Sequence, residues 1–196
     1  METIFRKGIY KIMELFYLNR NVAIHLREIA RRTGMNENSV SRFLNELVKS
    51  KILVSKKEGG VRKLSVSPKN VSLIFSIFDS ERFEKLSFVR RKAIFDYIDG
   101  VKEKPICLIL FGSSAKGQAK SDSDIDLLEI NDSTEKNSVL IKSIEAQRGV
   151  KLSVIRLSQR DFNRAIMDKD LVILSAIKSG FPVFGKDFFY EVIINE

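Results

Sequence analysis

Apolar residues in the first third of the chain recur at the spacing of amphipathic helices. They predict one helix over Ile4–Leu18 and a second, shorter helix over Leu26–Arg32. Gly34 interrupts the pattern, and Asn36 is a suitable N-cap for a third helix that ends near Ser50. The pattern therefore predicts three short helices, with a tight turn between the second and the third.

A hairpin is predicted directly after the third helix. The segments Ile52–Lys57 and Val61–Ser67 are β-like, and Glu58-Gly59-Gly60 between them is typical of a turn. Three helices followed by a two-stranded hairpin is the order of a winged helix-turn-helix. The stretch HLREIARRTGMNENSVSRFLNELVKSKILVSKKEGGVRKLSVSP resembles that family. The resemblance covers residues 1–69 and implies a DNA-binding domain.

Beyond residue 69 the pattern changes to a long helical stretch and then to short alternating runs. Residues 70–100 look mainly helical, and we interpret their recurring phenylalanines as packing in a connector. Residues 101–196 are predicted to form a second domain. Its strands are predicted at Ile106–Phe111, Asp124–Ile130, Val150–Leu157 and Phe181–Phe184, and its helices at Thr134–Arg148, Gln159–Met167 and Leu171–Ser179. The expected fold class is α+β, with a winged helix-turn-helix followed by a small mixed sheet flanked by helices.

The charge of the chain is concentrated in the predicted helix-turn-helix. The net charge is +9, and the fifteen Lys/Arg and six Asp/Glu of residues 1–69 account for all of it. A basic module on a neutral body points to a polyanionic partner such as double-stranded DNA. The single cysteine, Cys107, excludes an intramolecular disulfide, and the longest apolar runs are too short to span a bilayer. We therefore expect a cytoplasmic protein with no membrane partner.

The stretch LILFGSSAKGQAKSDSDIDLLEI carries the chemistry expected of the second domain. Gly112-Ser113 follows one predicted strand, and Asp124 and Asp126 lie on the next. Side chains at positions i and i+2 share one face of a strand, so the two carboxylates point the same way and repel each other unless a cation binds between them. Oxygen ligands suit Mg²⁺ (or Mn²⁺) that carries the phosphates of a nucleoside triphosphate.

This motif resembles the DNA-polymerase-β-like nucleotidyltransferase superfamily, and most closely its minimal nucleotidyltransferase branch. The resemblance runs from Phe111 to Leu128. It implies attack of a hydroxyl on the α-phosphate of a nucleoside triphosphate, with release of pyrophosphate. The residues that it assigns are Asp124 and Asp126 for metal binding and catalysis, and Gly112, Ser113 and Lys116 for nucleotide binding. The alternative interpretation is an exposed loop that leads into an edge strand with solvated acids.

The third predicted strand of this domain departs from the family pattern. The family usually carries a further carboxylate there, and Ser153 stands in its place. Glu129 does not replace it, because its odd spacing from Asp126 directs it to the opposite face of the strand. Nucleotide binding can survive this loss, whereas transfer can be crippled by it.

The helix-turn-helix resemblance also assigns candidate DNA contacts. The third helix would meet base edges in the major groove, and the hairpin would contact phosphates or the minor groove. The candidates are Asn38, Ser39, Arg42 and Asn45 on the helix, and Lys56, Lys57, Arg62 and Lys63 on the hairpin. A protein-docking or dimerisation module is the alternative, and the localised charge argues against it. A palindromic DNA site would be bound by a homodimer.

Three functions follow from the two resemblances. The first is an enzyme, localised on DNA, that transfers a nucleoside monophosphate to a hydroxyl of a protein or nucleic acid. Minimal nucleotidyltransferases often act as antitoxins, so a toxin is a candidate protein partner. The second is a transcription regulator whose catalytically weakened domain binds nucleotide and modulates DNA binding. The third is an interaction module with vestigial acids.

Overall fold

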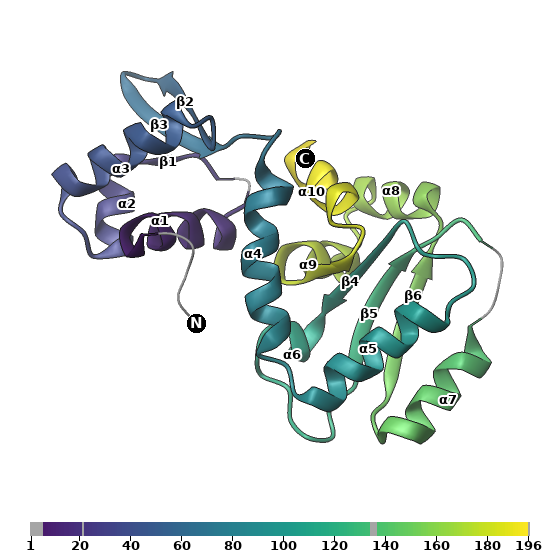
Figure 1. The fold of residues 1–196 in the computed structure, drawn as a ribbon. Helices are drawn as coiled ribbons and strands as arrows, with labels where there is room; N and C mark the ends of the chain where they lie inside the picture. The colour runs from purple at the N-terminus through teal and green to yellow at the C-terminus, as the bar shows by residue number, and fades with distance from the viewer. Residues whose placement is uncertain (1–5, 21, 134–136, 196) are drawn as a thin grey trace. The chain divides into compact units, whose positions relative to one another are not determined.

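The computed structural model describes residues 6–20, 22–133 and 137–195 (Figure 1). These residues divide into two compact units. One unit contains the described residues of Met1–Phe78 and Tyr190–Glu196, and the other contains those of Asp79–Phe189. The unit boundaries fall within α4 (Val71–Glu84) and α10 (Lys186–Asn195). None of the described helices is long and apolar enough to cross a membrane.

The first unit contains α1 to α3, parts of α4 and α10, and a three-stranded antiparallel sheet of order β1-β3-β2. Its first elements are α1 (Lys7–Leu18), β1 (Ile24–His25), α2 (Leu26–Thr33), α3 (Glu37–Lys49), β2 (Leu53–Glu58) and β3 (Val61–Val66). Gly34 has a φ of 67° and ends α2 in the left-handed conformation. The Asn36 side chain then accepts the backbone N–H of Ser39 at 2.8 Å, so Asn36 caps α3 as predicted.

The second unit is built around a four-stranded mixed sheet of order β6-β5-β4-β7. Its elements are α5 (Phe88–Gly100), β4 (Cys107–Phe111), α6 (Gly112–Ala115), β5 (Ile125–Ile130), α7 (Ser138–Arg148), β6 (Leu152–Leu157), α8 (Gln159–Met167), α9 (Leu171–Ser179) and β7 (Phe181–Phe184). β5 is parallel to β6, and the other pairs are antiparallel. One face of the sheet packs against α5 and α7, where Leu110 and Leu127 join Ile94, Tyr97 and Ile144 in a buried cluster.

The architecture confirms the expected α+β fold class. The predicted helix starts at Ile4 and Thr134 lie outside the described residues. The apolar pattern predicts neither β1 nor α10; β1 is only two residues long and exists through its pairing with β3. The interpretation of the phenylalanines as packing holds for Phe75, which is fully buried, but not for Phe88, which is 66 % exposed.

Candidate nucleotide site and nucleic-acid interface

The register of the sheet places Asp126 at the centre of the candidate nucleotide site. Asp126 lies opposite Phe111, the last residue of β4, and opposite Ser153 of the parallel neighbour β6. Residues directly opposite each other share one face of a sheet, so Ser153 is on the same face as Asp126. The motif Gly112-Ser113 follows Phe111 immediately and forms the short helix α6. The sheet therefore brings the Gly-Ser turn beside β5, which carries Asp126. Asp124, predicted to lie on the same strand, directly precedes its first residue, Ile125.

Gly112 allows the carboxylate of Asp126 to lie against the backbone of this turn. Its φ is 67°, a conformation that residues with a side chain rarely adopt. A Cβ atom at Gly112 would also lie 2.0 Å from Oδ2 of Asp126, far inside the contact distance. Glycine is thus required at this position both by the backbone conformation and by the neighbouring carboxylate.

The two acids of the motif interact electrostatically. Partial burial raises the pKa of the Asp126 carboxyl, the charge of Asp124 raises it further, and the guanidinium of Arg90 lowers it. A cation bound between Asp124 and Asp126 would relieve both of the effects that raise this pKa. Mg²⁺ commonly binds to one or two carboxylates and completes its shell with substrate phosphates and water, so the residues present fit one metal–nucleotide complex.

Arg90 of α5 holds the loop between α6 and β5. Its side chain is 6 % exposed. Nη1 donates to Oγ of Ser114 at 2.9 Å and to the carbonyl of Asp124 at 3.3 Å. Nη2 donates to the carbonyls of Lys120 and Ser123 at 2.9 and 2.6 Å. Sequence reasoning missed Arg90, because one arginine in a predicted connector helix carries no motif.

The two other predicted nucleotide ligands lie around the same turn. Ser113 is half-buried in α6, and its carbonyl accepts the N–H of Gln118 at 2.9 Å. Lys116 is exposed at the end of α6. Its side chain is therefore accessible to a phosphate or to solvent.

Within the described residues, no third acid joins the pair in a group that could hold a metal, since no three His, Cys, Asp or Glu side chains are grouped so that they could hold one. Glu129 lies on the other face of β5, as its spacing predicts: it is fully buried and accepts a hydrogen bond from the hydroxyl of Tyr97. Asn131 donates to Oε1 of Glu129 at 2.9 Å, and Nε of Arg156 lies 3.3 Å from the same oxygen. Glu129 thus belongs to a buried structural network.

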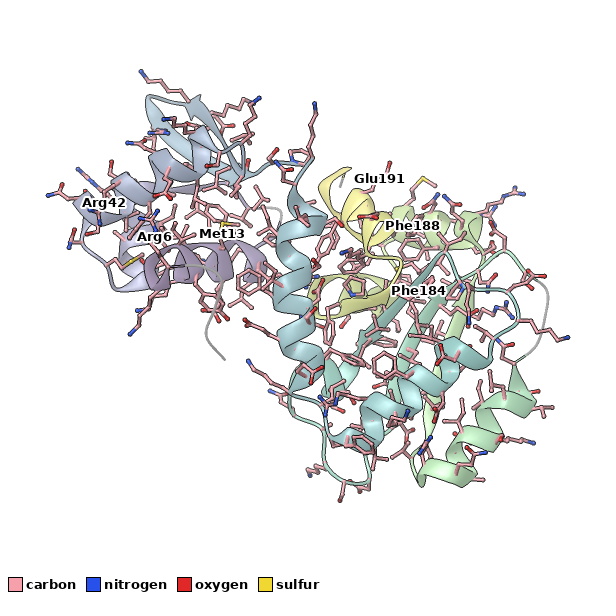
Figure 2. The ribbon with its side chains drawn as sticks, viewed as in Figure 1. Arg6, Met13, Arg42, Phe184, Phe188 and Glu191 are labelled. Atoms are coloured by element: carbon pink, nitrogen blue, oxygen red, sulfur yellow. The ribbon has the colours of Figure 1, made fainter. Side chains whose placement is uncertain are left out.

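The candidate DNA contacts on α3 form an exposed stripe. Asn38, Arg42 and Asn45 are exposed and lie at helical spacing, whereas Val40 and Leu44 on the opposite side are buried. Figure 2 shows Arg42 projecting from α3. Ser39 is half-buried, and its backbone N–H is occupied by the Asn36 cap. The structure therefore brings three of the four helix candidates onto one surface.

The candidates on the hairpin divide between its two faces. Lys57 lies opposite Arg62, and Lys56 lies opposite Lys63. Arg62 reaches α3, where Nη1 donates to Oδ1 of Asn45 at 3.0 Å, so the face with Lys57 and Arg62 is the one beside α3. Lys56 and Lys63 share the other face with Glu58. Nζ of Lys63 lies 2.9 Å and Nζ of Lys56 3.7 Å from a carboxylate oxygen of Glu58.

These two arrangements are those expected of a helix-turn-helix domain joined to a nucleotidyltransferase domain. Comparison with family models supports both halves. Residues 93–187 match the family described as Polymerase beta, Nucleotidyltransferase, and residues 11–56 match the IclR helix-turn-helix domain. The matches confirm the predicted fusion and support DNA binding by the first domain. No curated protein and no solved structure matches the chain.

Proposed function

We propose that the chain is a DNA-binding nucleotidyltransferase that transfers a nucleoside monophosphate from a nucleoside triphosphate to a hydroxyl of a protein or nucleic acid. The observation that carries the proposal is the approach of the Asp126 carboxylate to Gly112, beside Asp124. The turn at Gly112 thus lies directly against one of the two carboxylates that would bind a divalent metal, where the phosphates of a metal-bound nucleotide would be held. If the acceptor is a protein, a toxin paired with this chain as its antitoxin is the candidate.

Each residue of the site has a distinct part in this reaction. Asp124 and Asp126 would hold Mg²⁺ or Mn²⁺, which when bound neutralises charge on the triphosphate. Gly112, Ser113 and Lys116 would position the terminal phosphates. The acceptor oxygen forms a bond to the α-phosphorus, the bond from that phosphorus to the pyrophosphate oxygen breaks, and the hydroxyl proton passes to solvent. Positioning and charge neutralisation supply most of the catalysis in such reactions.

The direct test is label transfer. The full chain is incubated with Mg²⁺, α-labelled ATP, GTP, CTP or UTP in turn, and candidate protein and nucleic-acid acceptors. We expect label in an acceptor with one nucleotide, and loss of this label in the Asp124→Asn, Asp126→Asn variant. Wild-type protein that binds no nucleotide in the presence of Mg²⁺ would overturn the proposal.

The second candidate function is a transcription regulator that binds nucleotide without transferring it. Ser153 favours this candidate, because it lies opposite Asp126 where the resembled family carries its third carboxylate. The Ser153→Asp variant separates the two functions. If the wild type is inactive and this variant transfers label, the regulator is favoured; nucleotide-dependent DNA affinity of the wild type is then expected.

DNA binding would use the exposed stripe of α3 together with Lys57 and Arg62 of the hairpin. Arg42 is suited to guanine and Asn38 or Asn45 to adenine. Two copies of the chain would bind a palindromic site. The Arg42→Ala variant should weaken binding to the specific duplex, which fluorescence anisotropy measures.

A further inference from the structure

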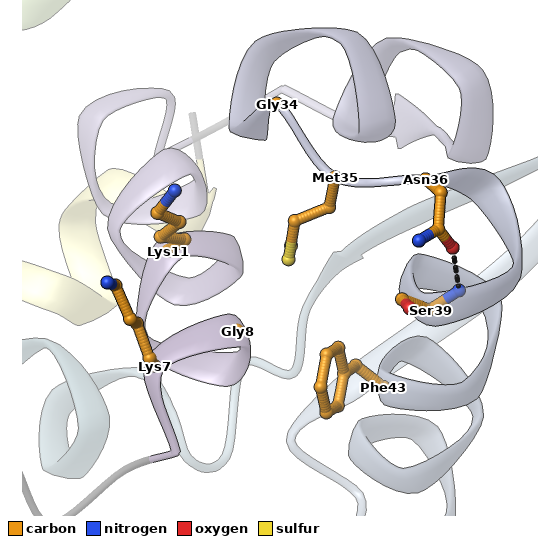
Figure 3. A pocket seen from close by; sticks show the side chains of 8 residues that line it. All are labelled: Lys7, Gly8, Lys11, Gly34, Met35, Asn36, Ser39 and Phe43. Carbon is orange, nitrogen blue, oxygen red and sulfur yellow. Dashed lines mark hydrogen bonds between the residues drawn. The ribbon is translucent and has the colours of Figure 1, made fainter.

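A groove of about 390 Å³ lies between α1 and the turn that leads into α3 (Figure 3). The α1 side carries Lys7 and Lys11, one helical turn apart. The α3 side carries Asn36, the N-cap of the helix, and Ser39; Phe43, one helical turn after Ser39, also lines the groove. None of these residues except Ser39 is assigned to DNA binding by the sequence.

The floor of the groove is apolar and fixed by close packing. The Phe43 ring packs so closely on Gly8 that a Cβ atom there would lie 2.4 Å from Cε2 of the ring. Met35, in the turn, extends toward the same space (Figure 3). The guanidinium carbon of Arg42 lies 5.2 Å from the centre of the Phe43 ring, so the groove adjoins the exposed stripe of α3.

The cationic side of the groove differs from the ion-paired part of the basic surface of this unit. Glu28 pairs with Arg31 and Arg32, and Glu58 pairs with the lysines of the outer hairpin face. In the part of the chain that the structure describes, no carboxylate pairs with Lys7 or Lys11. Lys11 instead donates to the carbonyl of Thr33 at 3.4 Å, at the end of α2. Two like charges one turn apart repel each other, and a bound anion would relieve this repulsion.

We propose that this groove seats a stretch of the sugar–phosphate backbone of duplex DNA, with Lys7 and Lys11 on the phosphates and Phe43 and Met35 against deoxyribose. The proposal rests on the proposed DNA binding by α3 and adds a backbone contact to it. Phosphate contacts beside a base-reading helix fix its register on the duplex without reading sequence. A groove that is cationic on one side and apolar at its floor matches the alternation of phosphate and sugar along a strand.

The test compares charge-removing and charge-keeping variants on a fluorescein-labelled duplex of mixed sequence. The double variants are Lys7→Gln with Lys11→Gln, and Lys7→Arg with Lys11→Arg; Lys142→Gln on α7 is the matched control. Dissociation constants are measured by anisotropy between about 50 and 200 mM salt. The plot of log affinity against log salt concentration should become shallower by about 0.9 for each phosphate that the variant no longer neutralises. We expect a change of about 1.8 for the glutamine pair, and none for the arginine pair or the control.

The same titration separates this proposal from the one on which it rests. If Arg42→Ala weakens binding while the glutamine pair keeps the wild-type slope, the groove does not seat DNA and the proposed DNA binding stands. If the wild type shows no salt-dependent binding, both fail. A slope change shared by the arginine pair would also overturn the proposal, because it would reflect altered packing rather than the removal of charge.

Discussion

At the scale of single residues, Gly112 has two roles in the candidate site: its backbone forms the turn, and its lack of a side chain admits the Asp126 carboxylate. Its φ of 67° turns the chain from β4 into α6, and its missing side chain leaves room for the Asp126 carboxylate. Gly117, five residues later, has a φ of 68° but has nothing within 4 Å of its Cβ position. Both glycines have a left-handed backbone, but only Gly112 has a carboxylate beside its Cβ position. Gly117 is therefore a matched control for substitutions at Gly112.

We predict that Gly117→Ala lowers the free energy of unfolding by about 1–2 kcal/mol, because it places a side chain in left-handed backbone, and that Gly112→Ala lowers it by more, because its Cβ atom would also meet the Asp126 carboxylate. Only Gly112→Ala should displace Asp126 and weaken binding of the Mg²⁺–nucleotide complex. Isothermal titration calorimetry on both variants measures the difference. Equal nucleotide affinities would show that the approach of Asp126 to Gly112 does not matter for binding.

Arg90 is a second residue whose contribution to stability can be predicted from its hydrogen bonds. Its guanidinium is almost fully buried and donates to the carbonyl oxygens of Lys120, Ser123 and Asp124 in the second half of the loop before β5. Hydrogen bonds from a charged donor contribute about 1.5–3 kcal/mol each, and unpaired buried acceptors are costly. We predict that Arg90→Gln lowers the free energy of unfolding by roughly 2–4 kcal/mol, measured by urea unfolding.

The neighbouring Arg91 is the control for this prediction. It pairs with Glu84, whose side chain is more than half exposed, so solvent weakens the pair. Arg91→Gln should therefore cost less than about 1 kcal/mol. A destabilisation as large as that of Arg90→Gln would mean that the hydrogen bonds of Arg90 to the loop add little.

At the scale of elements, the two faces of the hairpin matter more than the number of its lysines. Lys57 and Arg62 lie on the face beside α3, and Arg62 is bonded to Asn45. Lys56 lies on the other face with Glu58. A duplex that meets α3 is therefore expected to meet the face with Lys57.

We predict that Lys57→Ala weakens DNA binding and makes the salt dependence shallower by about 0.9, the effect of one phosphate contact. Lys56→Ala removes the same charge one residue earlier and should leave the slope close to that of the wild type. Anisotropy titrations at several salt concentrations compare the two variants. A larger effect for Lys56 would place the outer face of the hairpin on DNA.

The observed helices and strands show how much of the fold could be predicted from the sequence. The periodicity predicts α8, α9 and β7 with the bounds observed, since each has a clear apolar pattern with a capping or breaking residue beside it. The opposite orientation of Asp126 and Glu129 follows from the two-residue period of a strand, whereas Asp124, predicted on the same strand, directly precedes β5. Contacts between distant segments do not follow from this periodicity. Arg90 bonds to a loop about thirty residues away, and Arg62 bonds to Asn45; both contacts depend on tertiary packing.

At the scale of the whole chain, charge and chemistry are divided between two regions. The excess of +9 lies within residues 1–69, whereas Asp124 and Asp126 of the candidate nucleotide site lie in the second unit. DNA affinity and nucleotide affinity should therefore respond to different substitutions.

This division predicts the DNA binding of the Asp124→Asn, Asp126→Asn variant without nucleotide. The variant loses two negative charges, and a protein that bound DNA by its overall charge would bind more tightly with a steeper salt dependence. If the helix-turn-helix domain alone contacts the duplex, the slope and affinity should equal those of the wild type. Anisotropy titrations over the same salt range measure both quantities. A steeper slope would place the acidic strand close to DNA, and the acceptor hydroxyl would then be sought on the nucleic acid itself.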